Sequence, residues 1–222
     1  TGGRGGRPLH QGHPVTDAPP RIAVLDYGIG NLRSAEKALL HLGADAALVG
    51  DPEAIEAADA AVLPGVGAFG ACMDALDASG LADVARSFAA SGRPFLGICV
   101  GMQLLYEASD ETPGRTGLGI LEGTVGLIEG AVKRPQMQWN RLSVSSQNHP
   151  LIAGADGAWM YFVHSYAAPS GDEVIATCDY GGAVTAAVAR GNVWAVQFHP
   201  EKSGDAGLAL LENFVAYVGS GS

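Results

Sequence analysis

The most constraining feature of this chain is Cys99, which stands between Gly97 and Gly101 where an apolar run ends and a helical pattern begins. This G-x-C-x-G spacing is analogous to the G-x-S-x-G turn that exposes a nucleophile between a strand and a helix. Such a turn strains its central residue and crowds the neighbours, so the flanking positions favour residues without a Cβ atom. It also places the sulfur at a helix N-terminus, whose partial positive charge favours a thiolate. A lone buried cysteine is usually an inert core residue, but the two glycines and the strand–helix junction favour a nucleophile here.

Length and charge narrow the classes of protein that the chain can represent. Its 222 residues suit a single α/β domain, and a net charge of −10 argues against binding to nucleic acid or to a membrane surface. No apolar run is long enough to cross a bilayer, and none resembles a secretory signal. The cysteines are three in number and form no C-x-x-C pair, so we expect neither disulfides nor a metal site, no cofactor, and a cytoplasmic location.

The first twenty residues differ from the rest. Residues 1–20 are rich in Gly, Pro and His and have no apolar periodicity, so we expect a disordered extension in which His10 and His13 are not ligands. Residues 21–219 are expected to form a single domain.

Within that domain, short apolar runs alternate with helical patterns and then give way to a strand-rich half. Strands are expected at residues 21–26, 46–49, 60–63, 123–128, 141–144, 158–163, 173–178, 184–189 and 193–196, besides the run that ends at Cys99. Helices are expected at residues 32–42, 68–76, 81–90 and 205–218, besides the one after Cys99. This order predicts an α/β fold, with an open, mostly parallel twisted sheet, helices on both faces and an antiparallel extension at one edge. Cys72 falls in the second of these helices and is expected to pack in the core.

The segment Pro64-Gly65-Val66-Gly67, here called the donor loop, follows a buried strand. Its two glycines allow unusual backbone conformations that present N–H groups, and ligands of such sheets bind beyond the strand ends. An oxyanion needs donors of this kind near the nucleophile. By itself the segment would be an ordinary turn.

A third candidate stretch ends another strand, where His199 and Glu201 flank Pro200. In extended backbone, residues two apart point the same way, and proline stiffens the pair. A carboxylate on one imidazole nitrogen leaves the other free to accept a proton from a thiol. Isolated pairs of this kind usually lie on the surface, but their coincidence with Cys99 and the donor loop predicts a Cys-His-Glu triad.

These blocks resemble a known family. Residues 97–103 (GICVGMQ) and 198–201 (FHPE) are similar to the signature motifs of class I (triad-type) glutamine amidotransferases. Four further stretches resemble the glutaminase subunits of imidazole glycerol phosphate synthases, which serve histidine biosynthesis: residues 26–32, 64–69, 161–166 and 199–203. The resemblance, which runs from about residue 21 to the C-terminus, implies a flavodoxin-like fold. It further implies that glutamine is hydrolysed to glutamate and ammonia, and that ammonia passes to a (β/α)8-barrel cyclase subunit in a heterodimer. That cyclase would convert a phosphoribosyl-formimino intermediate to imidazole glycerol phosphate and AICAR.

The resemblance also implies residue roles. Cys99 would attack the glutamine amide, while His199, oriented by Glu201, would protonate the departing ammonia and activate water. Backbone N–H groups of Gly65, Val66, Gly67 and Val100 would hold the oxyanion. The glutamine would be held by Gln103, which lies one helical turn after Cys99, and by the backbone around His164 and Ser165. His164 is less expected as a second base than as a positioning residue.

The partner-facing residues implied by the resemblance are Met137, Trp139, Tyr161 and Lys202. One departure lies beside them, because the family usually has His-Met-Gly-Trp-Asn where this chain has Gln136-Met137-Gln138-Trp139-Asn140. These two replacements leave the local backbone and the partner contact open, whereas the triad is unchanged.

Two other interpretations remain open at this point. In the first, the chain serves another triad amidotransferase, such as one of pyridoxal phosphate or anthranilate synthesis. In the second, it is a non-catalytic scaffold, or a cysteine hydrolase of small molecules, on the same fold.

Overall fold

A twisted sheet forms the centre of the molecule. The structure, a computed structural model, describes residues 18–146 and 148–221, and most of the extension expected at residues 1–20 lies outside them. Within the described residues the largest sheet has eight strands in the order β2-β1-β3-β4-β13-β12-β11-β8. The strands are β1 (Arg21–Leu25), β2 (Asp45–Val49), β3 (Ala60–Gly65), β4 (Phe95–Cys99), β8 (Ser143–Val144), β11 (Val174–Asp179), β12 (Ala183–Arg190) and β13 (Val193–Val196).

The first five strands in that order run parallel, from β2 to β13, and the remaining three continue antiparallel. The expected mixed sheet with an antiparallel extension is therefore confirmed. Strands β3, β4 and β13 are buried along their whole length, which explains why they are continuous apolar runs without alternation.

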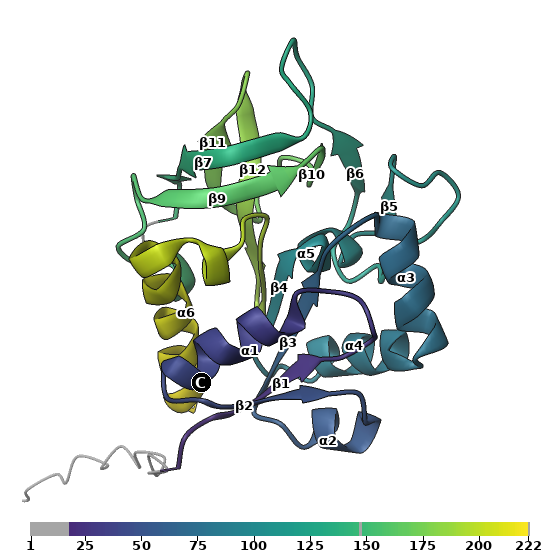
Figure 1. Cartoon of the computed structure of the whole chain (residues 1–222), viewed down its shortest axis with the longest axis vertical. Coiled ribbons are helices and arrows are strands. Elements are labelled where there is room, and N and C mark those ends of the chain that lie inside the picture. The colour runs from purple at the N-terminus through teal and green to yellow at the C-terminus, as the bar shows by residue number, and fades with distance from the viewer. Residues whose placement is uncertain (1–17, 147, 222) are drawn as a thin grey trace, which may run out of the picture.

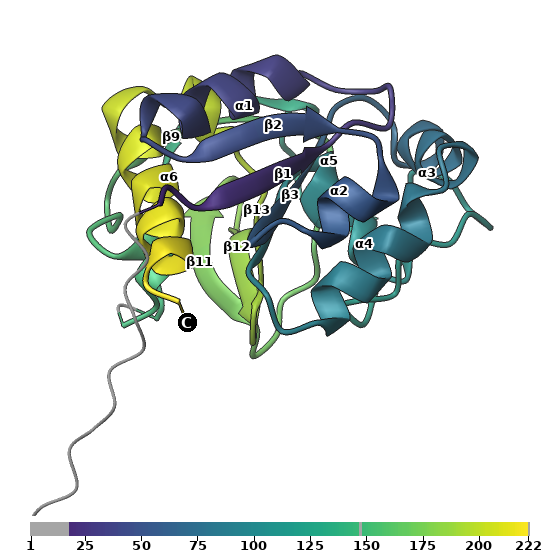
Figure 2. The ribbon, with the colours of Figure 1, turned by 90° about the horizontal axis from the view of Figure 1, so that it is seen from below.

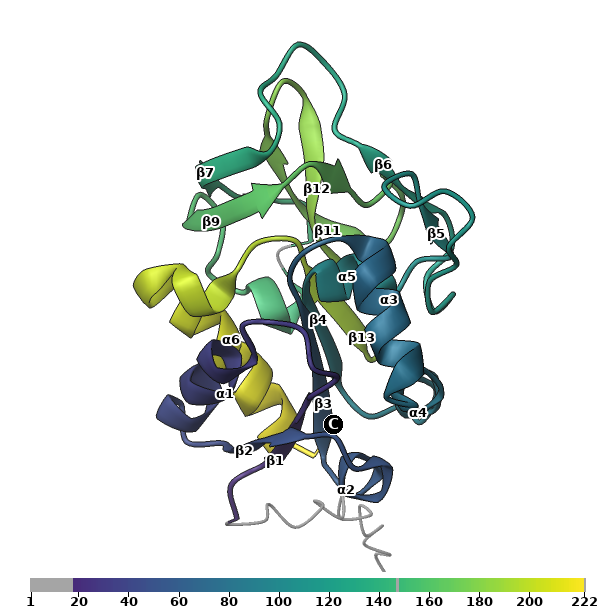
Figure 3. The ribbon, with the colours of Figure 1, turned by 45° about the vertical axis from the view of Figure 1, so that its right-hand side comes forward.

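Helices cover both faces of this sheet (Figure 2). They are α1 (Leu32–His41), α2 (Pro52–Glu56), α3 (Phe69–Ala78), α4 (Leu81–Ala90), α5 (Val100–Leu104) and α6 (Gly204–Gly219). Helices α1 and α6 lie on one face, and α2, α3 and α4 lie on the other (Figures 2 and 3). Helix α2 was not expected, because five residues are too few for a periodic pattern. Its start is nevertheless encoded, since the Asp51 side chain accepts a hydrogen bond from the Ala54 N–H at 3.0 Å.

Two smaller sheets lie beyond the carboxyl ends of the parallel strands (Figure 1). One contains β5 (Ala108–Ser109), β6 (Thr124–Leu127) and β10 (Tyr166–Ala167), and the other pairs β7 (Gln136–Arg141) with β9 (Trp159–His164). The strand expected at residues 141–144 is wrong in its bounds, because β7 ends at Arg141 and β8 begins at Ser143. Strand β7 was not predicted because four of its six residues are polar and because its two apolar residues, Met137 and Trp139, are exposed instead of facing the core.

Candidate active site

Cys99 lies at the junction that its sequence context predicts. It is the last residue of β4 and directly precedes α5, with φ 56° and ψ −114°. Among the described residues it is the one non-glycine residue with positive φ, a conformation that costs of order 1–3 kcal/mol and marks functional sites. The glycines are required by close packing, since a Cβ atom on Gly101 would lie 1.8 Å from the Leu63 carbonyl oxygen. The turn formed by residues 97–101, here called the elbow, therefore packs α5 against β3 and holds the cysteine in a strained conformation.

His199 follows β13, which pairs in parallel with β4, so its imidazole reaches the same edge of the sheet as Cys99. The His199 Nδ1 atom lies 2.8 Å from Glu201 Oε1, and both side chains are almost fully buried. The expected extended backbone is wrong here. Residues Pro200–Lys202 form a short 3-10 helix, and this tight turn brings the carboxylate back to the ring.

Electrostatics favour a protonated His199. Burial lowers the pKa of His199, but hydrogen bonds to Cys99 and Glu201 outweigh it and raise that pKa to about 9. Glu201 Oε2 is buried and has no hydrogen-bond partner among the described residues. A buried carboxylate in this situation needs a counter-charge, which the imidazolium supplies. The three side chains are thus arranged to move a proton from the thiol to the imidazole.

The donor loop lies beside this group. Gly65 is in register with Cys99 across the β3–β4 pair. A small cavity of about 10 Å³ is lined in part by Gly65, Val66, His199 and Glu201. The structure therefore brings the loop and the imidazole–carboxylate pair together, as the sequence predicts. Val100 is the first residue of α5, so its N–H group lies directly after Cys99 in the chain.

Two buried glutamines lie next to Cys99, and only one of them was expected. The Gln103 amide nitrogen donates to the Tyr166 carbonyl oxygen at 3.0 Å and to Gln197 Oε1 at 3.1 Å. Gln197 in turn places its amide nitrogen 3.9 Å from Cys99 Sγ. Because both amide hydrogens of Gln103 serve the protein, only its oxygen remains for a substrate. Gln197 was missed, although one polar residue in the apolar run from Val193 to Phe198 is a usable signal.

His164 is buried and its ring is held by the backbone. Nδ1 lies 2.8 Å from the Tyr166 carbonyl oxygen, so Nδ1 carries the proton and Nε2 is left as an acceptor. Burial, helped by nearby His199, lowers the pKa of His164 to about 4. A neutral imidazole with so low a pKa favours the positioning role over that of a second base. Neighbouring Ser165 uses its carbonyl oxygen to accept from the Ile128 N–H at 2.9 Å.

One face of the β7–β9 pair carries the residues expected to meet a partner. Directly opposed residues share a face, and Trp139 opposes Tyr161. Met137 and Trp139 are 61% and 48% exposed. Lys202 is also exposed, and it follows Glu201 directly in the sequence. Trp159, 55% exposed on the same face, was not expected. This set of residues, Met137, Trp139, Trp159 and Tyr161, is here called the outer face.

The two departures from the usual family motif are accommodated in a regular strand. Gln136 and Gln138 pair with His164 and Phe162 in continuous antiparallel register. Gln136 is fully buried, and its amide nitrogen lies 3.6 Å from Cys178 Sγ. Gln138 is exposed. The backbone is therefore undisturbed where the sequence left it in question.

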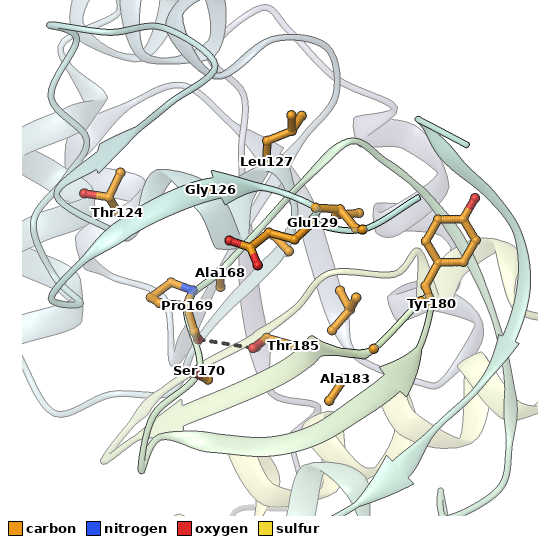
Figure 4. A pocket seen from close by; sticks show the side chains of 16 residues that line it. Thr124, Gly126, Leu127, Glu129, Ala168, Pro169, Ser170, Tyr180, Ala183 and Thr185 are labelled. Carbon is orange, nitrogen blue, oxygen red and sulfur yellow. Dashed lines mark hydrogen bonds between the residues drawn. The ribbon is translucent and has the colours of Figure 1, made fainter. Parts of the chain in front are cut away.

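Other features of the described residues are simpler. A wider hollow of about 540 Å³ lies between the segment after β6 and the β11–β12 turn, lined by residues such as Glu129, Pro169 and Tyr180 (Figure 4). No triad residue lines it. Across residues 18–146 and 148–221, no three His, Cys, Asp or Glu side chains gather as metal ligands would. No helix in that same part of the chain has the length and apolar character to cross a membrane.

Known proteins resemble this chain over most of its length. The family model described as "Glutamine amidotransferase class-I" matches residues 23–218. The protein named imidazole glycerol phosphate synthase subunit HisH from Methanothermobacter thermautotrophicus is 50% identical over 198 residues, covering 89% of this chain and 98% of that protein. The subunit of the same name from Methylococcus capsulatus is 49% identical, covering 88% and 96%.

Solved structures share the fold at lower identity. A structure titled "Structure of PurLQS from Thermotoga maritima" has a TM-score of 0.71 at 22% identity, covering 90% of this chain and 99% of that one. Another, titled "Crystal structure of glutamine amidotransferase", has a TM-score of 0.70 at 24% identity, covering 90% and 99%. With the relatives above, these likenesses show that the chain belongs to the class I glutamine amidotransferases and, within them, to the family of HisH subunits of imidazole glycerol phosphate synthase.

Proposed function

We propose that this chain is the glutaminase of an imidazole glycerol phosphate synthase, and that Cys99, His199 and Glu201 carry out the hydrolysis. The observation that carries the proposal is the strained Cys99 at the end of a strand that pairs with the strand leading to His199, whose Nδ1 atom lies 2.8 Å from the buried Glu201 carboxylate. Strain at a nucleophile, a base beside it and an orienting group behind the base form the arrangement that covalent catalysis requires.

The reaction follows from these positions. With the thiol proton already on the His199 nitrogen that faces away from Glu201, Cys99 Sγ attacks the side-chain amide carbon of glutamine. The oxyanion that forms accepts hydrogen bonds from the Val100 N–H and from the donor loop. The tetrahedral intermediate then expels ammonia, which takes the proton from His199, and a thioester on Cys99 remains. Water, deprotonated by His199, cleaves this thioester to release glutamate and restore the thiol.

The substrate would be held by the buried polar groups around the elbow. Gln103 offers its amide oxygen. The backbone of His164 and Ser165 lies in the same region, because the next residue, Tyr166, accepts hydrogen bonds from both Gln103 and His164. In this arrangement Gln103 and His164 share one carbonyl acceptor, which fixes both side chains before glutamine arrives. Such fixed groups lower the entropic cost of orienting a substrate.

The outer face would bind the cyclase partner, a (β/α)8 barrel of the HisF type, in a heterodimer. Three large apolar side chains that are about half exposed or more lie on one face of a two-stranded pair. Aromatic and methionine residues of this kind are enriched in binding surfaces. The face adjoins the triad, because Trp139 stacks edge-on against Tyr161 and Tyr161 lies 6.4 Å, ring to ring, from His199. Lys202 would sit at its margin.

We also propose that the complex works in the cytoplasm. The three cysteines, Cys72, Cys99 and Cys178, are free and buried. Reduced cysteines suit a reducing compartment and a thiol nucleophile.

The test is ammonia release from glutamine by the assembled complex with its cyclase. We expect release that Cys99→Ala abolishes and that Cys178→Ala, a matched removal of a buried thiol, leaves intact. Release from the Cys99→Ala complex, or none from the wild-type complex, would contradict the proposal. For the partner, Trp139→Ala should weaken copurification with the barrel cyclase, while Leu40→Ala, which removes a comparably exposed side chain on α1, should not. Copurification with a dodecameric or chorismate-binding partner instead would favour another amidotransferase.

A further inference from the structure

Behind the donor loop lies a buried pair of side chains that the reaction above does not use. Tyr27 follows β1 and Cys72 lies in the first turn of α3, and they are 4% and 0% exposed. The Tyr27 hydroxyl donates to the Pro64 carbonyl oxygen at 2.7 Å. The Cys72 thiol donates to the Val66 carbonyl oxygen at 3.2 Å. Two elements from different parts of the chain thus converge on two alternate carbonyl groups of one short loop.

Both donors keep their protons at neutral pH. Burial raises the pKa of Tyr27 well above its usual value, and the neighbouring Cys72 adds to the effect. Burial likewise raises the pKa of Cys72 and outweighs the opposing contributions of Tyr27 and of the Val66 backbone. Neither group therefore titrates near pH 7, and each has one hydrogen to give. Because Cys72 is fully buried and its hydrogen is directed at the loop, its thiol is a poor candidate for a second nucleophile.

The loop needs to be held from outside. Gly65 and Gly67 lack side chains, and Gly67 has φ 95°, so their backbone is free to adopt several conformations. Gly65 is also where the loop is packed most closely, since a Cβ atom there would lie 2.8 Å from the Gly101 N atom and 3.0 Å from the Tyr27 hydroxyl. A peptide unit is planar, with its C=O and N–H pointing in opposite directions. Fixing the carbonyl groups of Pro64 and Val66 therefore also fixes the N–H groups of Gly65 and Gly67.

We propose that Tyr27 and Cys72 are positioning residues that hold the donor loop in the conformation from which its N–H groups serve the oxyanion at Cys99. They clamp the peptide units on either side of the Gly65–Val66 peptide, so the N–H groups of Gly65 and Gly67 are held and any rotation within the loop is confined to the central unit. The inference rests on the proposed function, because it assigns the loop to the oxyanion of glutamine hydrolysis. It extends that function to two residues that do not touch the substrate.

The test uses variants that remove one hydrogen bond each in the full complex with the cyclase. Tyr27→Phe deletes the hydroxyl, Cys72→Ala deletes the thiol, and Cys72→Ser restores a donor. We expect kcat for glutamine hydrolysis to fall by about tenfold or more in the first two, below the 10²–10³-fold cost of losing an oxyanion donor outright. The KM for glutamine should stay within about twofold, because a donor that acts on the oxyanion acts in the transition state. Cys72→Ser should recover most of the loss.

Two further readouts separate positioning from general damage. Alkylation of Cys99 by iodoacetamide forms no oxyanion, so its rate should be unchanged in Tyr27→Phe and Cys72→Ala. Amide hydrogen exchange across residues 64–67 should become faster in these variants. The matched controls are Tyr106→Phe and Cys178→Ala, which alter a buried tyrosine and a buried cysteine elsewhere and should change neither kcat nor exchange of the loop.

An unchanged kcat in both Tyr27→Phe and Cys72→Ala would overturn the inference. So would equal losses in the controls, or alkylation that slows in parallel with hydrolysis. If the wild-type complex releases no ammonia, the proposed function fails instead, and the exchange measurement still decides whether the two residues hold the loop.

Discussion

The packing of Gly101 against β3 leads to a sharp prediction for Gly101→Ala. The added Cβ would lie 1.8 Å from the Leu63 carbonyl oxygen, whereas protein Cβ atoms almost never approach a neighbour within 3.0 Å. The obstacle is backbone on both sides, so α5 and β3 must separate by about 1 Å. Overpacking of a core costs typically about 1–3 kcal/mol, and a clash this severe belongs at the upper end.

Two measurements check this reasoning. A loss of about 3 kcal/mol should lower Tm by about 6 to 12 °C for a chain of this size. A displacement of about 1 Å at the nucleophile should cost about a hundredfold in glutaminase activity of the assembled complex. The matched control is Gly171→Ala, because no heavy atom lies within 4 Å of a Cβ at that position and its φ is not positive. A Gly101→Ala protein with wild-type Tm and wild-type activity would refute the account of the elbow.

Three further predictions concern the imidazole and its support. Glu201→Gln should lower the pKa of His199 from about 9, since it removes one of the bonds that favour the charged ring, and NMR titration of the ring carbons would detect this; an unchanged midpoint would contradict the pairing. Because folding raises the pKa of His199 above its usual 6.5, the stabilisation from this residue is complete below about pH 6.5 and is lost as pH rises through about 9. The free energy of unfolding, measured with denaturant, should show this decline in the wild type and less of it in His199→Gln. Gly207→Ala should reduce both Tm and glutaminase activity, because the added Cβ would lie 2.0 Å from the Pro200 carbonyl oxygen and would push α6 away from the turn at Pro200–Lys202. A variant with unchanged Tm and unchanged activity would refute this close packing of α6.

Local patterns were enough to predict much of the fold. The buried parallel strands are unbroken apolar runs, and helix α4 begins and ends at Leu81 and Ala90, as its periodicity predicts. Strand β7 could not be found in this way, because it is stabilised by pairing with β9 and its alternating apolar residues, Met137 and Trp139, are exposed and do not face the core. Its pairing partner is distant in sequence, and the periodicity of a single segment does not encode such a pairing.

In the candidate site, too, residues with a local sequence signal were predicted, and residues whose role depends on distant segments were not. Cys99 carries a local signal in its two glycines, and His199 and Glu201 carry one in their spacing. For His199 and Glu201, however, the backbone conformation was predicted wrongly, since a 3-10 turn and not extended backbone joins the imidazole to the carboxylate. Cys72 carries no such signal, and the signal of Gln197 is limited to one polar residue in an apolar run. Their roles depend on what lies opposite them in space, which the chain order does not reveal.

Tyr161 joins the outer face to the catalytic turn through its main chain. Its carbonyl oxygen accepts from the His199 N–H at 3.0 Å, and its own N–H donates to the Ser203 hydroxyl at 3.0 Å. A displacement of strand β9 would therefore also displace the turn that carries the His199 imidazole. We therefore expect a compound that binds at Trp139 and tilts β9 to stop hydrolysis without competing with glutamine. Inhibitors of this kind would act at the outer face and would not be displaced by a high glutamine concentration.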